Sequence, residues 1–373
     1  MKQACEQWDS PFNPFNSWKV LYHSNRLKAI RDWTLLTSQL PPPVSVTIDP
    51  TNKCNQNCVW CLYRGWKEKK QNQKNISIQK LYNLVDYLAT WGVKSICIAG
   101  GGEPTLYPHI EELVEFIGKH CVGFDLGFIC NGSNMSYDLS RLLARYAKFV
   151  GFSMDAGIYE TYAKLHRVKP DMFHKVLDNI KILRKHIITN NNSEIRIGYK
   201  YLLYHNINTS YADLHKACLN AISRGMDDIH FRVAYDKDQN QYSADLALAL
   251  NTIDKQLRPN LRSRINIYSV THKYGTDLTS PAKRFKKCYT TPLALTFGAD
   301  GNMWICCDTR GWKGMNLGSW LKVENIGKYW GSKKHFDMIQ KIKIENCPRC
   351  TFSFYNELFE NVILKDNMNI NLI

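Results

Sequence analysis

Residues 44–61 read VSVTIDPTNKCNQNCVWC, a short β-branched run followed at once by three cysteines. The run Val44–Asp49 is typical of a buried β-strand. Cys54, Cys58 and Cys61 then lie on the loop that leaves the carboxyl end of this strand. Thiolates are preferred ligands of zinc and of iron–sulfur clusters, so this spacing indicates a metal centre.

The number of thiols on this loop bears on which metal it holds. A structural zinc site normally closes four ligands, and no fourth cysteine or histidine stands near the three in sequence. Three thiolates suit instead a cubane [4Fe–4S] cluster whose fourth iron stays open to a small molecule. A structural zinc site and buried free thiols remain the alternatives.

The stretch that follows alternates between strand and helix patterns. Its clearest helix pattern is Ser77–Trp91, where Leu81, Leu84, Val85 and Leu88 form one apolar stripe. Apolar strands separated by amphipathic helices are typical of parallel βαβ units, so the sequence predicts an α/β fold over residues 44–235. An open doubly wound sheet and a partial barrel both fit this pattern. The other predicted elements are the strands Ser95–Ala99, Asp125–Cys130, Phe149–Asp155, Glu194–Leu203 and Asp228–Ala234 and the helices His109–Lys119, Tyr137–Lys148, Pro170–His186 and Ser210–Arg224.

Changes in composition divide the chain into further segments. Residues 1–43 form an aromatic-rich N-terminal extension that ends in three prolines, a stiff entry into the first strand. Residues 236–280 start polar and contain one helix-like run, Ala244–Leu257, so they are predicted to be a connector. Residues 281–355 contain a hairpin pattern (LALTF, a Gly/Asp turn, then NMWICC) and a terminal CxxC, so we expect a second, small domain there and a tail at 356–373.

Composition excludes several classes of protein. The 373 residues carry 49 Lys and Arg against 33 Asp and Glu, a net charge of +16. Acidic residues interrupt several basic stretches and no recognition motif accompanies them, so nucleic acid is not an expected partner. No apolar stretch is long enough to span a membrane, and the N-terminus lacks a secretion signal. We therefore expect a cytoplasmic protein whose 13 cysteines are metal ligands, catalytic groups or buried thiols rather than disulfides.

The cysteine loop resembles the CxxxCxxC signature of the radical S-adenosylmethionine (SAM) superfamily, in which an aromatic residue, here Trp60, precedes the third cysteine. Further motifs similar to those of the family follow in its order at the ends of the next three predicted strands. Parallel α/β folds bind ligands at the carboxyl ends of their strands, which agrees with these positions. The matching residues are Gly101-Gly102-Glu103-Pro104, Asn131 (after Cys130, where the family usually has threonine), and Ser153 with Asp155.

This resemblance implies a partial (βα)6 barrel with two cofactors, a [4Fe–4S] cluster and SAM. The three cysteines of the loop would hold the cluster, and its open iron would chelate the methionine end of SAM. Trp60 and the later motifs would surround SAM, and His166 is a further candidate to meet its carboxylate. An electron from a donor such as flavodoxin or ferredoxin cleaves SAM in this family, and the 5′-deoxyadenosyl radical then abstracts hydrogen from a substrate.

A second set of cysteines lies in the predicted C-terminal domain: Cys288, Cys306 and the CxxC of Cys347 and Cys350. The spacing alone permits a four-cysteine zinc site. The set also resembles the Twitch form of the SPASM/Twitch extension, which implies one auxiliary [4Fe–4S] cluster. Four ligands leave no open iron, so we expect an electron-transfer role. Cys307 adjoins Cys306 and is the alternative ligand.

The sequence leaves several interpretations of the reaction open. A single, fully ligated auxiliary cluster favours oxidation, dehydration or epimerisation of a small polar molecule such as a sugar, aminocyclitol or nucleoside, an oxidoreductase-type activity. A peptide-modifying maturase is one alternative, although the 43 residues before the first strand look too short for a peptide-binding segment. RNA modification rests only on the positive charge. A zinc-stabilised binding module without catalytic activity is the alternative outside the enzymes.

Overall fold

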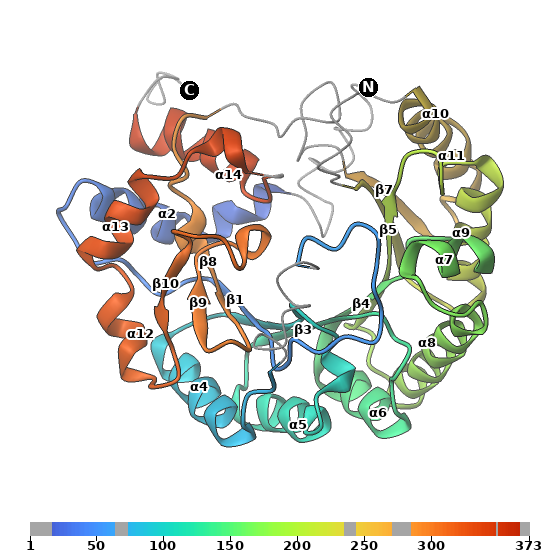
Figure 1. The fold of residues 1–373 in the computed structure, drawn as a ribbon, viewed down its shortest axis with the longest axis horizontal. Helices are drawn as coiled ribbons and strands as arrows, with labels where there is room; N and C mark the ends of the chain where they lie inside the picture. Colours follow the sequence, from blue (N-terminus) through green and yellow to red (C-terminus); the bar gives the residue numbers. More distant parts are fainter. Residues whose placement is uncertain (1–16, 64–73, 235–243, 271–284, 348–349, 366–373) are drawn as a thin grey trace.

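The computed structural model describes residues 17–63, 74–234, 244–270, 285–347 and 350–365. The core is one ten-stranded sheet in the order β10-β9-β8-β1-β2-β3-β4-β5-β6-β7. Figure 1 shows these strands as an arc with helices along its outer side. The strands are β1 (Ser45–Ile48), β2 (Ser95–Ile98), β3 (Asp125–Cys130), β4 (Ala147–Ser153), β5 (Arg196–Leu203), β6 (Asp228–Val233), β7 (Asn266–Val270), β8 (Ala294–Phe297), β9 (Asn302–Trp304) and β10 (Asn316–Ser319).

The strands predicted between residues 44 and 235 are all present as β1–β6, which confirms the α/β fold class. They pair in parallel with little shift in register between neighbouring strands. For example, Ser45 lies opposite Ser95, which lies opposite Asp125. The carboxyl ends of β1, β2 and β3 therefore meet at one edge of the sheet. Within the described residues no ladder joins β10 to β7, so the barrel is partial.

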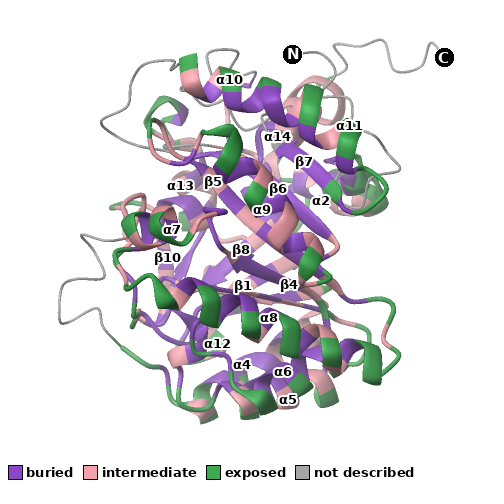
Figure 2. Cartoon of the chain, turned by 90° about the vertical axis from the view of Figure 1, so that its right-hand side faces the viewer, coloured by how far each residue is buried: buried purple, intermediate pink, exposed green. Residues whose placement is uncertain are grey.

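Helices cover the outer face of this sheet, as the βαβ pattern predicts (Figures 1 and 2). In α4 (Ile78–Trp91) the predicted stripe of Leu81, Leu84, Val85 and Leu88 is fully buried. Burial of such a stripe against a sheet is the main stabilisation of an amphipathic helix. The other helices of this part are α5 (Ile110–His120), α6 (Tyr137–Tyr146), α7 (Tyr159–His166), α8 (Asp171–Thr189) and α9 (Tyr211–Ser223).

Two details differ from the elements that the sequence predicts. The predicted helix Tyr137–Lys148 ends at Tyr146, because β4 begins at Ala147 and already contains Lys148. The sequence also predicts no helix at α7, whose eight residues are too few to show a repeating apolar stripe. This helix matters for the site, because it lies directly after β4.

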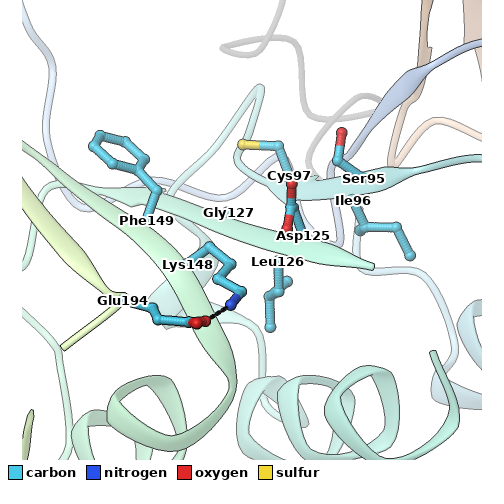
Figure 3. Close-up of a pocket in the computed structure, with 9 residues that line it drawn as sticks. All are labelled: Ser95, Ile96, Cys97, Asp125, Leu126, Gly127, Lys148, Phe149 and Glu194. Carbon is cyan, nitrogen blue, oxygen red and sulfur yellow. Dashed lines mark hydrogen bonds and ion pairs between the residues drawn. The ribbon is translucent and has the colours of Figure 1, made fainter. Parts of the chain in front are cut away.

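The amino-terminal end of the barrel is filled by an aromatic side chain. The ring of Phe149 on β4 occupies space left by Gly151 and Gly198, since a Cβ at either glycine would lie 3.0 Å from it. A cavity of about 550 Å³ opens beside Phe149 at this end, and Lys148 and Glu194 form an ion pair at its rim (Figure 3). This cavity lies at the opposite end of the strands from the cysteine loop.

Residues 236–280, predicted to be a connector, contribute a further strand. The helix-like run is present as α10 (Ala244–Thr252), followed by the π-helix η4 (Ile253–Leu257) and by α11 (Arg258–Leu261). The chain then forms β7, which pairs in parallel with β6. The sequence predicts no strand here, because Asn266–Val270 mixes polar and apolar residues without a clear period.

The C-terminal segment continues the same sheet. β8 pairs in parallel with β1, with Ser45 opposite Ala294, and the predicted hairpin joins β8 to β9 through Gly301 at a φ of 83°. The N-terminal helix α2 (Ser24–Thr34) packs on this segment, where Trp33 Nε1 donates to the Gly331 carbonyl oxygen at 2.9 Å. The described part of the N-terminal extension, residues 17–43, thus contacts the C-terminal segment.

Short helices complete the described part of the chain. Among the described residues no helix combines the length and the apolar character needed to cross a membrane. The remaining elements are η1 (Ser17–His23), η3 (Pro104–Leu106), η5 (Thr291–Leu293), η6 (Cys307–Thr309), α12 (Glu324–Tyr329), α13 (Lys333–Gln340), η7 (Ile344–Asn346), α14 (Ser353–Leu358) and η8 (Phe359–Leu364).

Candidate functional site

A cavity of about 290 Å³ lies at the carboxyl ends of the barrel strands. Every residue that the sequence analysis assigned to the cluster or to SAM lines this cavity, although the residues come from four separate loops. The three cysteines are half-buried there. The predicted lining residues are Cys54, Cys58, Trp60, Cys61, Gly101, Gly102, Glu103, Pro104, Asn131, Ser153 and Asp155.

Helix α7 holds the backbone of the cysteine loop. The Asn57 amide donates to the His166 carbonyl oxygen at 3.2 Å, and the Val59 amide donates to the Leu165 carbonyl oxygen at 3.0 Å. These bonds satisfy two carbonyl groups at the C-terminus of α7, which the helix itself leaves free. The loop therefore has a fixed path without regular secondary structure of its own.

The imidazole of His166 lies directly behind Cys58. Its Nδ1 is 3.3 Å from Cys58 Sγ and 2.9 Å from Gln56 Oε1. Its Nε2 is 3.0 Å from the Met154 carbonyl oxygen. Burial lowers the pKa of His166 to about 4, against the effect of the Met154 carbonyl, so the ring is neutral at neutral pH. The sequence suggested His166 as a partner of the SAM carboxylate; it lies against a cysteine of the loop and also lines the cavity, so this role stays a prediction.

Gln56 is a contact that the sequence analysis did not single out. Its Nε2 donates to the Tyr162 hydroxyl at 3.0 Å, and its side chain is buried between Tyr162 and His166. Trp60 packs edge-on against the same imidazole, with ring centres 5.2 Å apart. A buried glutamine between two cysteines of a loop is a weak sequence signal, because its partners come from a helix about 100 residues later in the chain.

Gly102 allows the glycine motif to lie against the start of the cysteine loop. A Cβ on Gly102 would come within 2.2 Å of the Lys53 carbonyl oxygen. The Gly102 amide donates to the Thr51 carbonyl oxygen at 3.2 Å, and the Glu103 amide donates to the Lys53 carbonyl oxygen at 2.8 Å. A close backbone approach of this kind needs glycine. The motif thus builds one wall of the cavity together with the cysteine loop.

The Glu103 carboxylate ties this motif to the next strand rather than pointing to an open position. Its Oε1 accepts from the Thr105 amide at 3.0 Å, and its Oε2 accepts from the Asn131 amide at 2.7 Å. The Asn131 side chain continues the chain of contacts, donating to Asn55 Oδ1 at 2.9 Å. Glu103 and Asn131 therefore hold the glycine motif, the end of β3 and the cysteine loop in register.

Asp155 lies at the end of β4 in a strained conformation. Its φ is 55°, a region that side-chain-bearing residues rarely adopt. Its Oδ1 accepts from the Leu202 amide at 2.7 Å, and Asn208 Nδ2 donates to its carbonyl oxygen at 2.7 Å. Burial raises the pKa of the Asp155 carboxyl to about 7, although the Leu202 amide and Arg232 act in the opposite direction. Strain of this kind persists where the surroundings fix it and is common at functional sites.

The C-terminal cysteines form a second group. Burial raises the pKa of the Cys288 thiol, and the neighbouring Cys350 and Cys347 thiols raise it further. Cys306 and Cys307 lie with Asp308 in a group whose ligand atoms are all within 4.8 Å of one another. Both thiols belong to this group, so the choice of Cys306 over Cys307 stays a prediction.

Two hydrogen bonds connect the segments that carry these cysteines. Thr351 Oγ1 donates to Asp308 Oδ2 at 2.8 Å and so links the CxxC to η6. Asn356 Nδ2 lies 3.6 Å from Cys288 Sγ and anchors that cysteine to α14. The four predicted ligands therefore come from segments that the fold places in one region.

The thiols of the first group fit an iron–sulfur cluster. Three thiolates line a cavity that also exposes glycine backbone and polar side chains, as a cluster with an open iron and a polar ligand requires. The His166 imidazole, 3.3 Å from Cys58 Sγ, is positioned behind this thiol as outer-shell groups are behind the ligands of metal sites.

The fold and this cavity define a parallel α/β barrel protein with a thiolate-rich cofactor site at the carboxyl ends of its strands. Residues 48–213 match the family model described as "Radical SAM superfamily". The matched segment contains the three cysteines of the loop and all the later motifs. The chain therefore carries a radical SAM domain, and the cofactors of that superfamily are a [4Fe–4S] cluster and SAM.

Relatives cover only parts of the chain. The UPF0026 protein of Helicobacter pylori (strain ATCC 700392 / 26695) is 25% identical over 150 residues, which are 39% of this chain and 49% of that protein. The antilisterial bacteriocin subtilosin biosynthesis protein AlbA of Bacillus subtilis (strain 168) is 25% identical over 177 residues, 47% of this chain and 38% of AlbA. The chain thus spans half or less of the length of these curated relatives.

The fold is also similar to that of a solved structure, Streptococcus suis SuiB bound to the precursor peptide SuiA. The TM-score is 0.61 at 15% sequence identity, and the similarity covers 89% of this chain and 74% of SuiB. The similarity extends beyond the segment matched by the family model, so the C-terminal segment shares it.

Proposed function

We propose that this protein is a radical SAM enzyme that reductively cleaves SAM and abstracts a hydrogen atom from a substrate. The observation that carries this proposal is the single cavity lined by the three cysteines, the glycine motif and the residues at the ends of β3 and β4. When bound, the cluster supplies an electron that breaks the S–C5′ bond of SAM, giving methionine and the hydrogen-abstracting 5′-deoxyadenosyl radical.

The chain's own residues position the reactants in this proposal. Cys54, Cys58 and Cys61 bind the cluster through their sulfur atoms. The backbone of the glycine motif meets the methionine end of SAM, because glycines let polar backbone groups approach a ligand closely. Ser153 and Asp155 contact the sugar and methionine portions from β4. Bound SAM and substrate would displace water from the cavity, which protects a reactive radical from side reactions.

The second group of cysteines is proposed to hold an auxiliary [4Fe–4S] cluster. Cys288, Cys306, Cys347 and Cys350 supply four thiolates, which complete the ligation of one cluster. Four thiolates would leave no open iron for a substrate, and the cluster would supply an acceptor for the electron that a substrate radical loses on oxidation. A small electron-transfer protein, such as a flavodoxin or ferredoxin, reduces the first cluster. The alternative is a zinc ion at the second site. The zinc and iron contents of the purified protein distinguish the two.

One candidate substrate class is a peptide, although the curated relatives include GTP 3′,8-cyclases as well as peptide-related proteins. AlbA takes part in the synthesis of a bacteriocin, and SuiB is seen with its precursor peptide. The similarity to SuiB includes the C-terminal segment and thus most of this chain. The sequence-based objection, that residues 1–43 are too short to bind a peptide, concerns one mode of binding and does not exclude binding at the barrel mouth.

A small polar substrate, favoured by the sequence analysis, remains the second candidate. Curated relatives described as GTP 3′,8-cyclases, and the single fully ligated auxiliary cluster proposed above, favour this class. The two candidates predict different products: either a peptide or a small metabolite should change in mass when the reduced enzyme turns over. Incubation with SAM and either cell peptides or cell metabolites, followed by mass spectrometry, identifies the pool that loses hydrogen.

Metal analysis and SAM cleavage test the proposed chemistry together. Anaerobic reconstitution of the full chain should yield about eight iron and about eight sulfide ions per chain, as two [4Fe–4S] clusters require. Replacing Cys54, Cys58 and Cys61 together by alanine should abolish 5′-deoxyadenosine production and leave about four iron ions. Stoichiometric zinc without iron, or continued production by the triple variant, would overturn the proposal.

A further inference from the structure

A buried ion pair lies between the two cysteine regions. Asp49 directly follows β1, and Arg310 directly follows η6. Arg310 Nη1 is 2.7 Å from Asp49 Oδ2, and the two side chains are 4% and 0% exposed. Burial raises the pKa of the Asp49 carboxyl to about 6, while the Arg310 charge and the Gly101 backbone amide lower it. The pair therefore also adjoins the glycine motif.

Tyr63 connects this ion pair to both groups of cysteines. It stands two residues after Cys61 and lines the cofactor cavity. The Arg310 guanidinium lies over its ring, 4.9 Å from the ring centre. Its hydroxyl donates a hydrogen bond to the carbonyl oxygen of Cys307. One side chain thus contacts the wall of the cofactor cavity, the buried ion pair and the backbone beside the second group of cysteines.

The segment 306–310 consequently contacts the cofactor cavity from the C-terminal side. Its Arg310 reaches the end of β1, its Cys307 carbonyl receives Tyr63, and its Asp308 is held by Thr351 of the CxxC region. Removing one partner of a buried charge pair leaves the other charge without compensation. A change in any of these contacts is therefore expected to move residues that line the cavity.

We propose that Tyr63, Asp49 and Arg310 are positioning residues that hold segment 306–310 against the cofactor cavity and thereby set its affinity for SAM. This inference rests on the proposed function, because it assumes that SAM binds beside Cys54, Cys58 and Cys61. It adds that the C-terminal segment completes the SAM site from outside the matched radical SAM domain. None of the three residues needs to touch SAM for this effect.

The test uses two conservative variants of the full chain, Tyr63→Phe and Arg310→Lys. Tyr63→Phe removes only the hydroxyl, and Arg310→Lys keeps the charge but loses the planar group over the ring. Arg258→Lys is the matched control, because Arg258 also forms a mostly buried 2.7 Å pair, with Asp254, beside β7. The readout is the SAM concentration that half-saturates the change in the electron paramagnetic resonance spectrum of the reduced protein, alongside the melting temperature.

Both site variants should need about five- to tenfold more SAM for half-saturation, which is the effect on SAM binding when the free energy of about one contact of segment 306–310 is lost. The control should bind SAM as the wild type does, whatever its melting temperature. If Tyr63→Phe and Arg310→Lys reach half-saturation at the same SAM concentration as the wild type, the inference is wrong. The ion pair of Asp49 and Arg310 then has only a structural role. If Arg310→Lys fails to fold, Tyr63→Phe decides. A wild-type protein that binds no SAM at all would instead overturn the proposed function, and this inference with it.

Discussion

The two cysteine regions are built in different ways. The first group lies within residues 54–61, on one loop whose backbone is held by α7. The second group extends from residue 288 to residue 350 and depends on contacts between η6, the CxxC and α14. A local group can be recognised from spacing alone, whereas a dispersed group acquires its geometry only from the fold. We therefore expect substitutions in the two regions to differ in their effects on SAM cleavage, on substrate conversion and on stability.

Single cysteine substitutions should show the largest contrast. Cys58→Ala should abolish 5′-deoxyadenosine production, because two thiolates and one vacant position do not hold a cluster with a defined open iron. Cys350→Ala should retain SAM cleavage but stop conversion of the substrate, since the proposed electron acceptor is lost. Product analysis by mass spectrometry measures both. Equal loss of SAM cleavage in the two variants would show that the regions act as one centre.

Gly102→Ala, in the glycine motif that lies against the cysteine loop, should strongly destabilise the protein. The new Cβ would lie 2.2 Å from a backbone oxygen, which cannot give way as a flexible side chain can. We expect the free energy of unfolding to fall by about 3 kcal/mol, from overpacking and the loss of the loop contact. Gly123→Ala is the control: Gly123 has a φ of 87° but open space around it, so only the backbone cost of about 1 kcal/mol applies. Urea unfolding of the metal-free protein compares the two, and equal losses would contradict the close approach.

Glu103→Gln should give a smaller loss than Gly102→Ala. The amide keeps the size of the side chain but places an N–H group where the carboxylate accepts hydrogen bonds from the Thr105 and Asn131 amides. A mismatch of this kind costs about 2 kcal/mol in the free energy of unfolding. Glu112→Gln, on the exposed side of α5, is the control and should be near neutral. A Glu103→Gln variant as stable as the wild type would show that Glu103 contacts a ligand rather than the strands.

Much of the first region could be predicted from sequence because its signals are local. The first four barrel strands end close to the predicted cysteine, glycine and polar motifs. The apolar stripe of α4 is buried, as its helical period predicts. The sequence did not identify Gln56, Tyr63 or Arg310, although each is central to the contacts of the cavity. Their partners lie about 100 or more residues away in the chain, and polar residues of this kind are common on protein surfaces. Only the fold shows that Gln56 and Arg310 are buried and that Tyr63 is half-buried beside Arg310.

The arrangement of the C-terminal region, in contrast, could not be predicted from the sequence. Its cysteines suggested a separate small domain, yet β8 pairs with β1 and the segment shares the sheet of the barrel. Composition changes near residue 281, but strand pairing depends on hydrogen bonds between distant segments, which composition does not report. β7 shows the same difficulty, because a short strand at a sheet edge has a weak apolar pattern. The boundary of the second domain thus stays a prediction, while the continuity of the sheet is observed.

A buried histidine in the C-terminal region predicts an effect that appears only as the pH falls. His335 is fully buried against Trp33 and Trp330, and burial lowers its pKa to about 3 from the ordinary 6.5. Between these two values the unfolded chain binds a proton that the folded protein does not. The contribution of His335 therefore lowers the free energy of unfolding by about 1.4 kcal/mol for each pH unit as the pH falls below 6.5.

The variant His335→Gln removes this titration, so its free energy of unfolding should depend less steeply on pH between 6.5 and 5 than that of the wild type. Its absolute stability at pH 7.5 should be lower, because Gly331 loses the acceptor Nδ1 at 3.1 Å. The exposed His174→Gln should keep the wild-type slope. Urea unfolding across this pH range measures the slopes, and identical slopes in all three proteins would show that His335 is protonated in the folded state. Such protonation would mean that the contact of α2 with the C-terminal segment opens as the pH falls, unlike the first region, where α7 encloses the cysteine loop.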